Sequence, residues 1–401
     1  MSDGCCFCCW LFAVCQDCHR IATGLPHAVL YSPHFRYTLT LAGGAYFGAV
    51  VADALTLGTH YEYDAHRIKK FYGAIDQFYA PGEKTNGETH GIGWGARNYH
   101  GGNGNGPSKR AGENTDYGDY NVLVLEHLAA NHPAKNKPIQ LTELIPRWQN
   151  ALKTWRSWIC SMTKTTYQQV QQGTPFDQLG GHSNAMAIRS AAAYAFFDNE
   201  QDIAAAARTT LFTHKEKSAL DVSEFFAKVS YRIIYQDLSP KQAIVSVAKD
   251  SSSFIQQKVQ QALDKVEEAT DASNPLSKEE YVDDLALTSM ARLWDVGKTE
   301  PIKVGKASPT EGTLPGSVYF IVKYSEDSNE DNAFRAAAQS NAEVGGDNAC
   351  RSIAIGMVLG AWQGVGAIPA EWGAGKYEQW EYSEKLLSKG PLLLARDGAE
   401  L

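Results

Sequence analysis

The chain has 401 residues, of which 44% are hydrophobic, and its formal net charge at pH 7 is −8. This is enough chain to build a sizeable core in one domain or two. The acidic balance, with no long run of lysine or arginine, argues against a DNA- or RNA-binding role, and we expect no nucleic-acid partner.

Cysteines crowd the N-terminus, in the stretch MSDGCCFCCWLFAVCQDC. A secreted disulfide-bonded protein would spread its cysteines through the fold, so this distribution predicts a reducing, cytoplasmic setting. The apolar run from Cys5 to Cys15 is too short for a transmembrane segment, and only Asp3 is charged before it, which argues against a secretory signal. Residues 1–38 are predicted to form a poorly ordered leader, with S-acylation or metal capture as the alternative.

The pattern becomes helical at residue 39. The first predicted helix covers residues 39–56 and carries small residues at three- and four-residue spacing, which let a neighbouring helix approach closely. These small residues are Gly43, Gly44, Gly48 and Ala52. A second buried helix is expected over residues 119–130.

Residues 80–114 interrupt this pattern with a long stretch rich in glycine and asparagine. It lacks the Gly-Lys-Ser/Thr ending of a phosphate-binding P-loop. A loop of this length is typical of a mobile lid, which would carry His90, Trp94 and His100, or of a plain surface excursion.

Helix starts are also marked in the second half of the chain. Ser239 stands before Pro240, and Ser277 with Glu280 fits a capping box. Residues 316–322 (GSVYFIV) come closest to a strand pattern, although a helix fits them as well. The sequence therefore predicts an all-α fold of roughly a dozen helices. We expect one domain over residues 39–376, followed by a C-terminal helix and tail over 377–401.

Carboxylates and hydroxyls stand at the ends of these helices in three separate stretches. The residues are Asp53 and Glu62 in the first, Thr115, Asp116 and Asp119 in the second, and Asp347 with Asn348 in the third. Oxygen ligands of this kind suit Mg²⁺. An aspartate in such a position can equally serve only to cap a helix.

Five short motifs follow one another along the chain, and their order indicates a family resemblance. They are Ala52-Asp53-Ala54 after a glycine-rich helix, NTDYG at 114–118, SNAMAIR at 183–189, Thr213-His214, and GGDNAC at 345–350 followed by IPAEW at 368–372. Together they resemble the signatures of the ADP-ribosylglycohydrolase superfamily across most of residues 40–375. The motifs NTDYGD and GGDNACRS are most similar to those of one branch of the superfamily, the J-crystallins and selenoprotein J.

The resemblance implies a compact helical hydrolase fold with a magnesium site. Carried over, Thr115, Asp116 and Asp347 would hold metal, and Glu62 would act as general acid or base at the anomeric carbon of ADP-ribose. The substrate would be ADP-ribose or an ADP-ribosylated protein.

The resemblance also implies substrate-binding residues. Asp53 and Asn184 would contact the substrate, although Asp53 could equally be a helix-end residue. Arg189 would pair with the diphosphate or form an internal salt bridge. His214 would contact substrate or be a structural core histidine.

Several positions depart from the family pattern. Tyr117 and Gly118 stand where the family has Asp and Thr, and Asn348, Ala349 and Cys350 stand where it has Thr, Asp and Thr. Alanine has no ligand atom, and a thiolate suits Mg²⁺ poorly. The site is therefore expected to be partly eroded, which leaves open a catalytically inactive protein with a lens-type or other bulk structural role. A third interpretation is a reactive Cys350 whose pKa is lowered by the helix N-terminus and Arg351.

Overall fold

The computed structural model describes residues 33–62, 65–85, 108–131, 136–271, 273, 308–327 and 330–394. Most of the leader, the helix expected to open at Ser277 and Glu280, and the proposed lid residues His90, Trp94 and His100 lie outside these ranges.

The described chain consists of helices and their connections. In chain order the α-helices are α1 (Pro33–Thr56), α2 (Ala65–Tyr72), α4 (Asp116–Asn131), α5 (Leu141–Leu152), α6 (Ser161–Gln171), α7 (Glu200–Thr210), α8 (Lys217–Gln236), α9 (Pro240–Lys249), α10 (Ser253–Thr270), α12 (Thr310–Glu326), α13 (Ala333–Val344), α14 (Asn348–Gln363), α15 (Trp380–Leu387) and α16 (Pro391–Leu394). Short 3₁₀ turns are η3 (Phe176–Gln178), η4 (Ala193–Ala195), η7 (Val365–Ala367) and η8 (Ala370–Trp372). Within these ranges no strand forms, and the prediction of an all-α fold is confirmed.

The predicted helix over 39–56 corresponds to α1, which already begins at Pro33. Proline is favoured in the first turn of a helix because no intrahelical partner is needed for its missing N–H. Residues 316–322 lie inside α12 and are therefore helical. None of the helices in the described part of the chain is both long and apolar enough to cross a bilayer.

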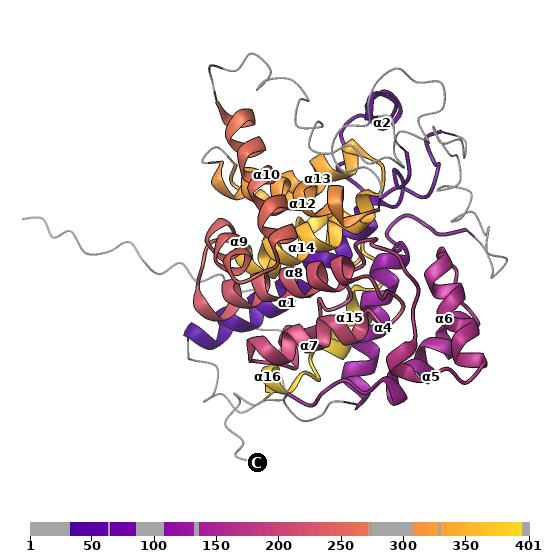
Figure 1. Ribbon diagram of the computed structural model, residues 1–401. Coiled ribbons are helices and arrows are strands. Elements are labelled where there is room, and N and C mark those ends of the chain that lie inside the picture. The colour runs from indigo at the N-terminus through magenta and orange to yellow at the C-terminus, as the bar shows by residue number, and fades with distance from the viewer. Residues whose placement is uncertain are drawn as a thin grey trace, which may run out of the picture.

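Helices α1 and α14 run side by side through the middle of the molecule, and α8 and α12 pack against α14 (Figure 1). Glycines make this central contact possible. A Cβ placed on Gly44 would lie 2.1 Å from the carbonyl oxygen of Gly360, which means that the two backbones touch directly. The small residues of the first helix predicted a close approach by a neighbouring helix, and the contact of Gly44 with Gly360 confirms this prediction.

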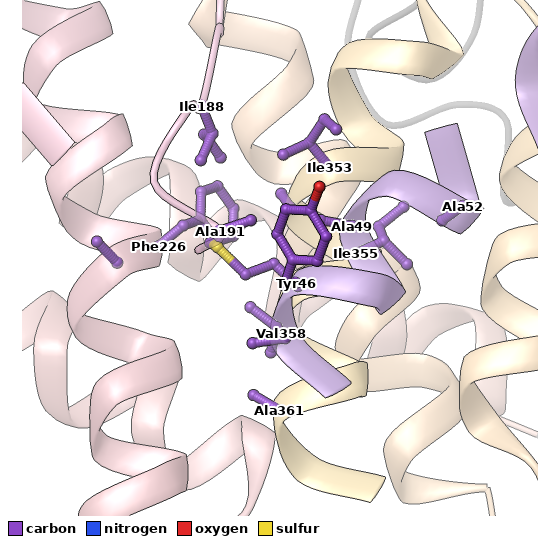
Figure 2. Close-up of a cluster of buried hydrophobic side chains, with 14 of the residues drawn as sticks. Tyr46, Ala49, Ala52, Ile188, Ala191, Phe226, Ile353, Ile355, Val358 and Ala361 are labelled. Carbon is purple, nitrogen blue, oxygen red and sulfur yellow. The ribbon is translucent and has the colours of Figure 1, made fainter. Parts of the chain in front are cut away.

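The core fills the space around this helix pair. Tyr46 and Ala49 of α1 meet Ile353 and Val358 of α14, with Phe226 of α8 facing them (Figure 2). Residues 41–56 of α1 and 348–361 of α14 are all buried, and these include polar residues such as Asp53 and Asn348 at the ends where the two helices approach α4. The candidate site forms where the C-terminal end of α1 and the N-terminal ends of α4 and α14 meet.

Candidate functional site

Asp53, near the C-terminal end of α1, is fully buried and held by donors that precede α4. Its Oδ1 accepts from the Thr115 hydroxyl at 2.6 Å, and its Oδ2 accepts from the Thr115 N–H at 2.9 Å and from the Asn114 amide at 3.0 Å. Burial raises the pKa of Asp53 to about 7, although these hydrogen bonds act in the opposite direction. The carboxylate therefore joins α1 to α4.

The N-terminus of α4 places Asp116, Tyr117 and Gly118 beside Asp53. Asp116 is the first residue of the helix and is buried. The Tyr117 N–H donates to the Thr115 hydroxyl oxygen at 3.2 Å. A Cβ on Gly118 would lie 2.3 Å from Asp53 Oδ2, so Asp53 occupies the space that a side chain at 118 would need.

Asp347 caps α14 and receives a hydrogen bond from α4. Its Oδ1 accepts from the Cys350 N–H at 3.3 Å, and its Oδ2 accepts from the Tyr117 hydroxyl at 2.8 Å. Burial, followed by the charge of Asp347, raises the pKa of Tyr117 well above its usual value, so the hydroxyl stays protonated and able to donate. His60 Nδ1 lies 3.9 Å from Asp347 Oδ1 and 3.2 Å from the side-chain oxygen of Asn348.

Glu62 lies next to the turn that precedes Asp347. The Gly346 N–H donates to the Glu62 carbonyl oxygen at 2.6 Å, and the Tyr61 N–H donates to the Gly346 carbonyl oxygen at 2.8 Å. The Glu62 carboxylate lies 3.2 Å from Arg67 Nε and is almost completely buried. The structure thus brings together the segments that carry Glu62, Asp116 and Asp347.

Asp119 has protein partners of its own. Its Oδ2 accepts from the Lys109 ammonium at 2.6 Å and from the Ser157 hydroxyl. Both partners belong to segments that pack beside α4, so this carboxylate tethers them to the helix.

Asn184, which the resemblance implies as a substrate contact, donates to Glu311 in this structure. Its amide nitrogen lies 2.9 and 2.7 Å from the two Glu311 carboxylate oxygens. Sequence reasoning missed Glu311. The available signal was an acidic residue shortly after Pro309, a combination typical of the first turn of a helix.

Arg189 is buried beneath α4. Its guanidinium carbon lies 3.6 Å from the centre of the Tyr120 ring, and Nη1 donates to the Thr210 carbonyl oxygen at 3.3 Å. Burial lowers its pKa, and the charge of Asp116 is among the influences that raise it. Arg189 therefore lies in the same electrostatic neighbourhood as the N-terminus of α4.

His214 is a buried neighbour of Arg189. Its Nδ1 lies 2.9 Å from the Thr213 hydroxyl. Burial, reinforced by the Arg189 charge, lowers the pKa of His214 to about 3, so the ring is neutral at physiological pH. A neutral buried imidazole suits the core role that was one of its two predicted roles.

Cys350 does not have the electrostatics that were expected of a reactive thiol. The side chain is fully buried, and its Sγ donates to the Asp347 carbonyl oxygen at 3.1 Å. Burial raises the pKa of Cys350 well above its usual value, and the opposing influence of Arg351 is weaker. The predicted lowering of this pKa is therefore wrong: desolvation outweighs the helix N-terminus.

The donors around these carboxylates can be tested against the magnesium site that the resemblance implies. The Thr115 hydroxyl donates to Asp53, and Asp347 receives Tyr117 on one oxygen and the helix N–H on the other. Ala349 and Cys350 add no oxygen ligand to the first turn of α14. Mg²⁺ keeps several waters and is held through one or two carboxylates, so each ion of a pair needs carboxylate oxygens of its own. Because the Asp53 and Asp347 oxygens already accept hydrogen bonds from the protein and the first turn of α14 adds no further oxygen ligand, this donor set does not fit a pair of magnesium ions. In the described part of the chain, no three His, Cys, Asp or Glu side chains stand close enough together to hold a metal ion.

The described part of the chain is thus an all-α body in which polar residues gather at the ends of helices α1, α4 and α14. The sequence profile described as ADP-ribosylglycohydrolase matches residues 38–399, and the chain belongs to that family.

Solved structures agree on the fold. There are 45 similar chains, including one described as "ADP-ribosylglycohydrolase-related protein complex". It is 15% identical, covers 90% of this chain and 99% of its own length, and gives a TM-score of 0.52. Identity at this level shows the fold alone. No curated protein matches the chain in sequence.

Proposed function

We propose that this chain is a catalytically inactive member of the ADP-ribosylglycohydrolase family with a structural role, as in the J-crystallin branch that its sequence resembles. The observation that carries this proposal is the first turn of α14, where Ala349 and Cys350 are fully buried at positions that bear oxygen ligands in the family signature. A binuclear site that loses these oxygens loses affinity for at least one ion.

A structural role requires a stable and densely packed body. The direct backbone contact of α1 with α14 and the burial of every polar group at their meeting ends support such a role. The net charge of −8 favours solubility at high concentration. The cysteine distribution supports a cytoplasmic location, because clustered rather than dispersed cysteines suit a reducing compartment.

A second candidate function is magnesium-dependent hydrolysis at the anomeric carbon of ADP-ribose, free or attached to protein. The observation that favours it is the meeting of the segments that carry Glu62, Asp116 and Asp347. In this candidate Glu62 would act as general acid or base. Thr115, Asp116 and Asp347 would hold a single magnesium ion. Asn184 and Arg189 would first have to exchange their present partners for the substrate.

A turnover assay separates the two candidates. The purified full chain is incubated with ADP-ribosylated peptides that differ in linkage, with Mg²⁺ or with EDTA, and released ADP-ribose is measured. We expect no release above buffer in either condition. Release that requires Mg²⁺ and disappears in Asp116→Ala would overturn the structural proposal.

Calorimetry provides an independent readout. Mg²⁺ and ADP-ribose are titrated into the wild-type chain and into Asp116→Ala. The structural proposal predicts the same dilution heats for both proteins, whereas the hydrolase candidate predicts binding heat in the wild type alone.

A further inference from the structure

The contact between Tyr117 and Asp347 suggests how this fold compensates for its altered site. We infer that the Tyr117 hydroxyl replaces a divalent cation at Asp347, so that hydrogen bonds rather than a metal ion join α1, α4 and α14. The inference rests on the proposed inactive site and adds what stabilises that site.

The first step is the environment of Asp347. This carboxylate is fully buried at the end of α14, where an isolated negative charge would be strongly destabilising. The Tyr117 hydroxyl at 2.8 Å and the Cys350 N–H at 3.3 Å each bind one oxygen. A hydroxyl that donates to a carboxylate makes one of the stronger hydrogen bonds in proteins, and with these two donors both Asp347 oxygens are engaged by the protein.

The second step is the anchoring of Tyr117 itself. Its N–H donates to the Thr115 hydroxyl oxygen, and that hydroxyl donates to Asp53 at 2.6 Å. Hydrogen bonds at the backbone N–H and at the side-chain hydroxyl of Tyr117 therefore connect Asp53 on α1, through Thr115 and the N-terminus of α4, to Asp347 at α14. Metal ions would bridge the same elements in a site of the family type, so the network performs the same structural task.

The third step is the space around the neighbouring residue. A Cβ on Gly118 would lie 2.3 Å from Asp53 Oδ2 and 2.4 Å from the Asn114 amide nitrogen. Only glycine therefore allows Asp53 to close onto Thr115 in this arrangement. Tyr117 and Gly118 depart from the family signature side by side, and each is required by the same network.

Deleting the hydroxyl tests the inference. Tyr117→Phe should lower the melting temperature of the full chain by about 2–5 °C, because a buried carboxylate loses its donor. Tyr382→Phe is the matched control, since its hydroxyl also donates to a carboxylate, Glu126 Oε1 at 2.7 Å, but at an exposed site. The control should change the melting temperature by less than about 1 °C.

A double-mutant cycle shows whether Asp347 is the partner. Asp347→Ser keeps a good N-cap but is too short to reach Tyr117. In that background Tyr117→Phe should have less than half of its effect in the wild type. An undiminished effect, or no effect of Tyr117→Phe in the wild type, would overturn the inference.

The unmodified chain gives a readout that needs no variant. We expect Mg²⁺, Mn²⁺ and EDTA to leave its melting temperature unchanged within about 1 °C, since an ion that bound the folded state would raise it. A rise of several degrees with Mg²⁺ would contradict the inference even if no ADP-ribose were released. Conversely, ADP-ribose release without any metal effect on melting would overturn the proposed function and leave this inference intact.

Discussion

The backbones of Gly48 in α1 and Gly356 in α14 are in direct contact. A Cβ on Gly48 would lie 2.2 Å from the Gly356 carbonyl oxygen, and a Cβ on Gly356 would lie 2.1 Å from that of Gly48. The contact is reciprocal and involves backbone on both sides, so no side-chain rotation can relieve an added methyl group.

Substituting either glycine should therefore destabilise the fold. We expect Gly48→Ala and Gly356→Ala each to lower the free energy of unfolding by about 3 kcal/mol, at the upper end of the usual cost of overpacking. Urea unfolding followed by circular dichroism measures this. Gly43→Ala is the matched control, because the nearest atom to its added Cβ would be 4.0 Å away. The better helix propensity of alanine should make it neutral or stabilising by up to about 1 kcal/mol, and a large loss there would contradict the packing argument.

The buried His214 should make stability depend on pH. Its pKa is about 3 in the folded chain, below the ordinary value of 6.5, so between these values the unfolded chain binds a proton that the folded chain does not. Protonation of His214 in the unfolded chain therefore lowers the free energy of unfolding as the pH falls from 6.5 toward 3, and it has no such effect above pH 6.5. At pH 5 the loss amounts to about 2 kcal/mol relative to pH 7.

The variant His214→Gln isolates this effect. The difference in unfolding free energy between wild type and variant should shift by about 2 kcal/mol in favour of the variant between pH 7 and pH 5. His182→Gln is the comparison, because His182 is exposed and lies 2.9 Å from Glu216. A surface pair of this kind should change the difference by less than about 1 kcal/mol. If both variants behaved alike, burial of His214 would not be the cause.

Two helix N-caps that look alike in sequence should differ in energy. Ser239 accepts from the Gln242 N–H and completes a capping box at α9, whereas Ser252 at α10 makes no such side-chain bond. Ser239→Ala should cost about 1 kcal/mol and Ser252→Ala less than half of that. Thermal unfolding of the two variants checks the order, and an equal loss would show that the serine side chain is not the source.

The two cysteines of the described chain should differ in reactivity. Cys350 is fully buried with a raised pKa, and Cys160 is partly exposed. In the native protein at pH 8, iodoacetamide should alkylate Cys160 at least about tenfold faster than Cys350, because the thiolate is the reacting form. Mass spectrometry of tryptic peptides at timed intervals gives both rates, and labelling in urea should remove the difference.

Helices with local signals were the predictable part of this fold. The start of α9 follows from Ser239 and Pro240, and α4 covers the predicted 119–130 because its apolar residues are contiguous in sequence. Residues 316–322 were ambiguous for a physical reason. In α12 every residue from Gly312 to Val322 is buried, so the helix has no polar face and its sequence shows no helical period.

The candidate site was predictable only as separate pieces. Their positions at predicted helix ends pointed to Asp53, Thr115 and Asp347 as metal ligands or helix caps. The sequence did not show which side chains they would hydrogen-bond. The Tyr117–Asp347 bond joins residues 230 positions apart, and the Asn184–Glu311 pair joins residues 127 positions apart. Such pairings are set by how the helices pack, which no local pattern in the chain records.

The long separation between α1 and α14 has a consequence for synthesis. His60, just past the end of α1, contacts Asn348 at the start of α14 across 288 positions. At ribosomal rates of about 5–20 residues per second, α1 emerges roughly 15–60 s before the surface that covers it. Over that interval its apolar, glycine-lined face is unsheltered in the nascent chain. We therefore expect co-translational chaperone capture to concentrate on residues 39–56, and release to coincide with the appearance of residues 345–364.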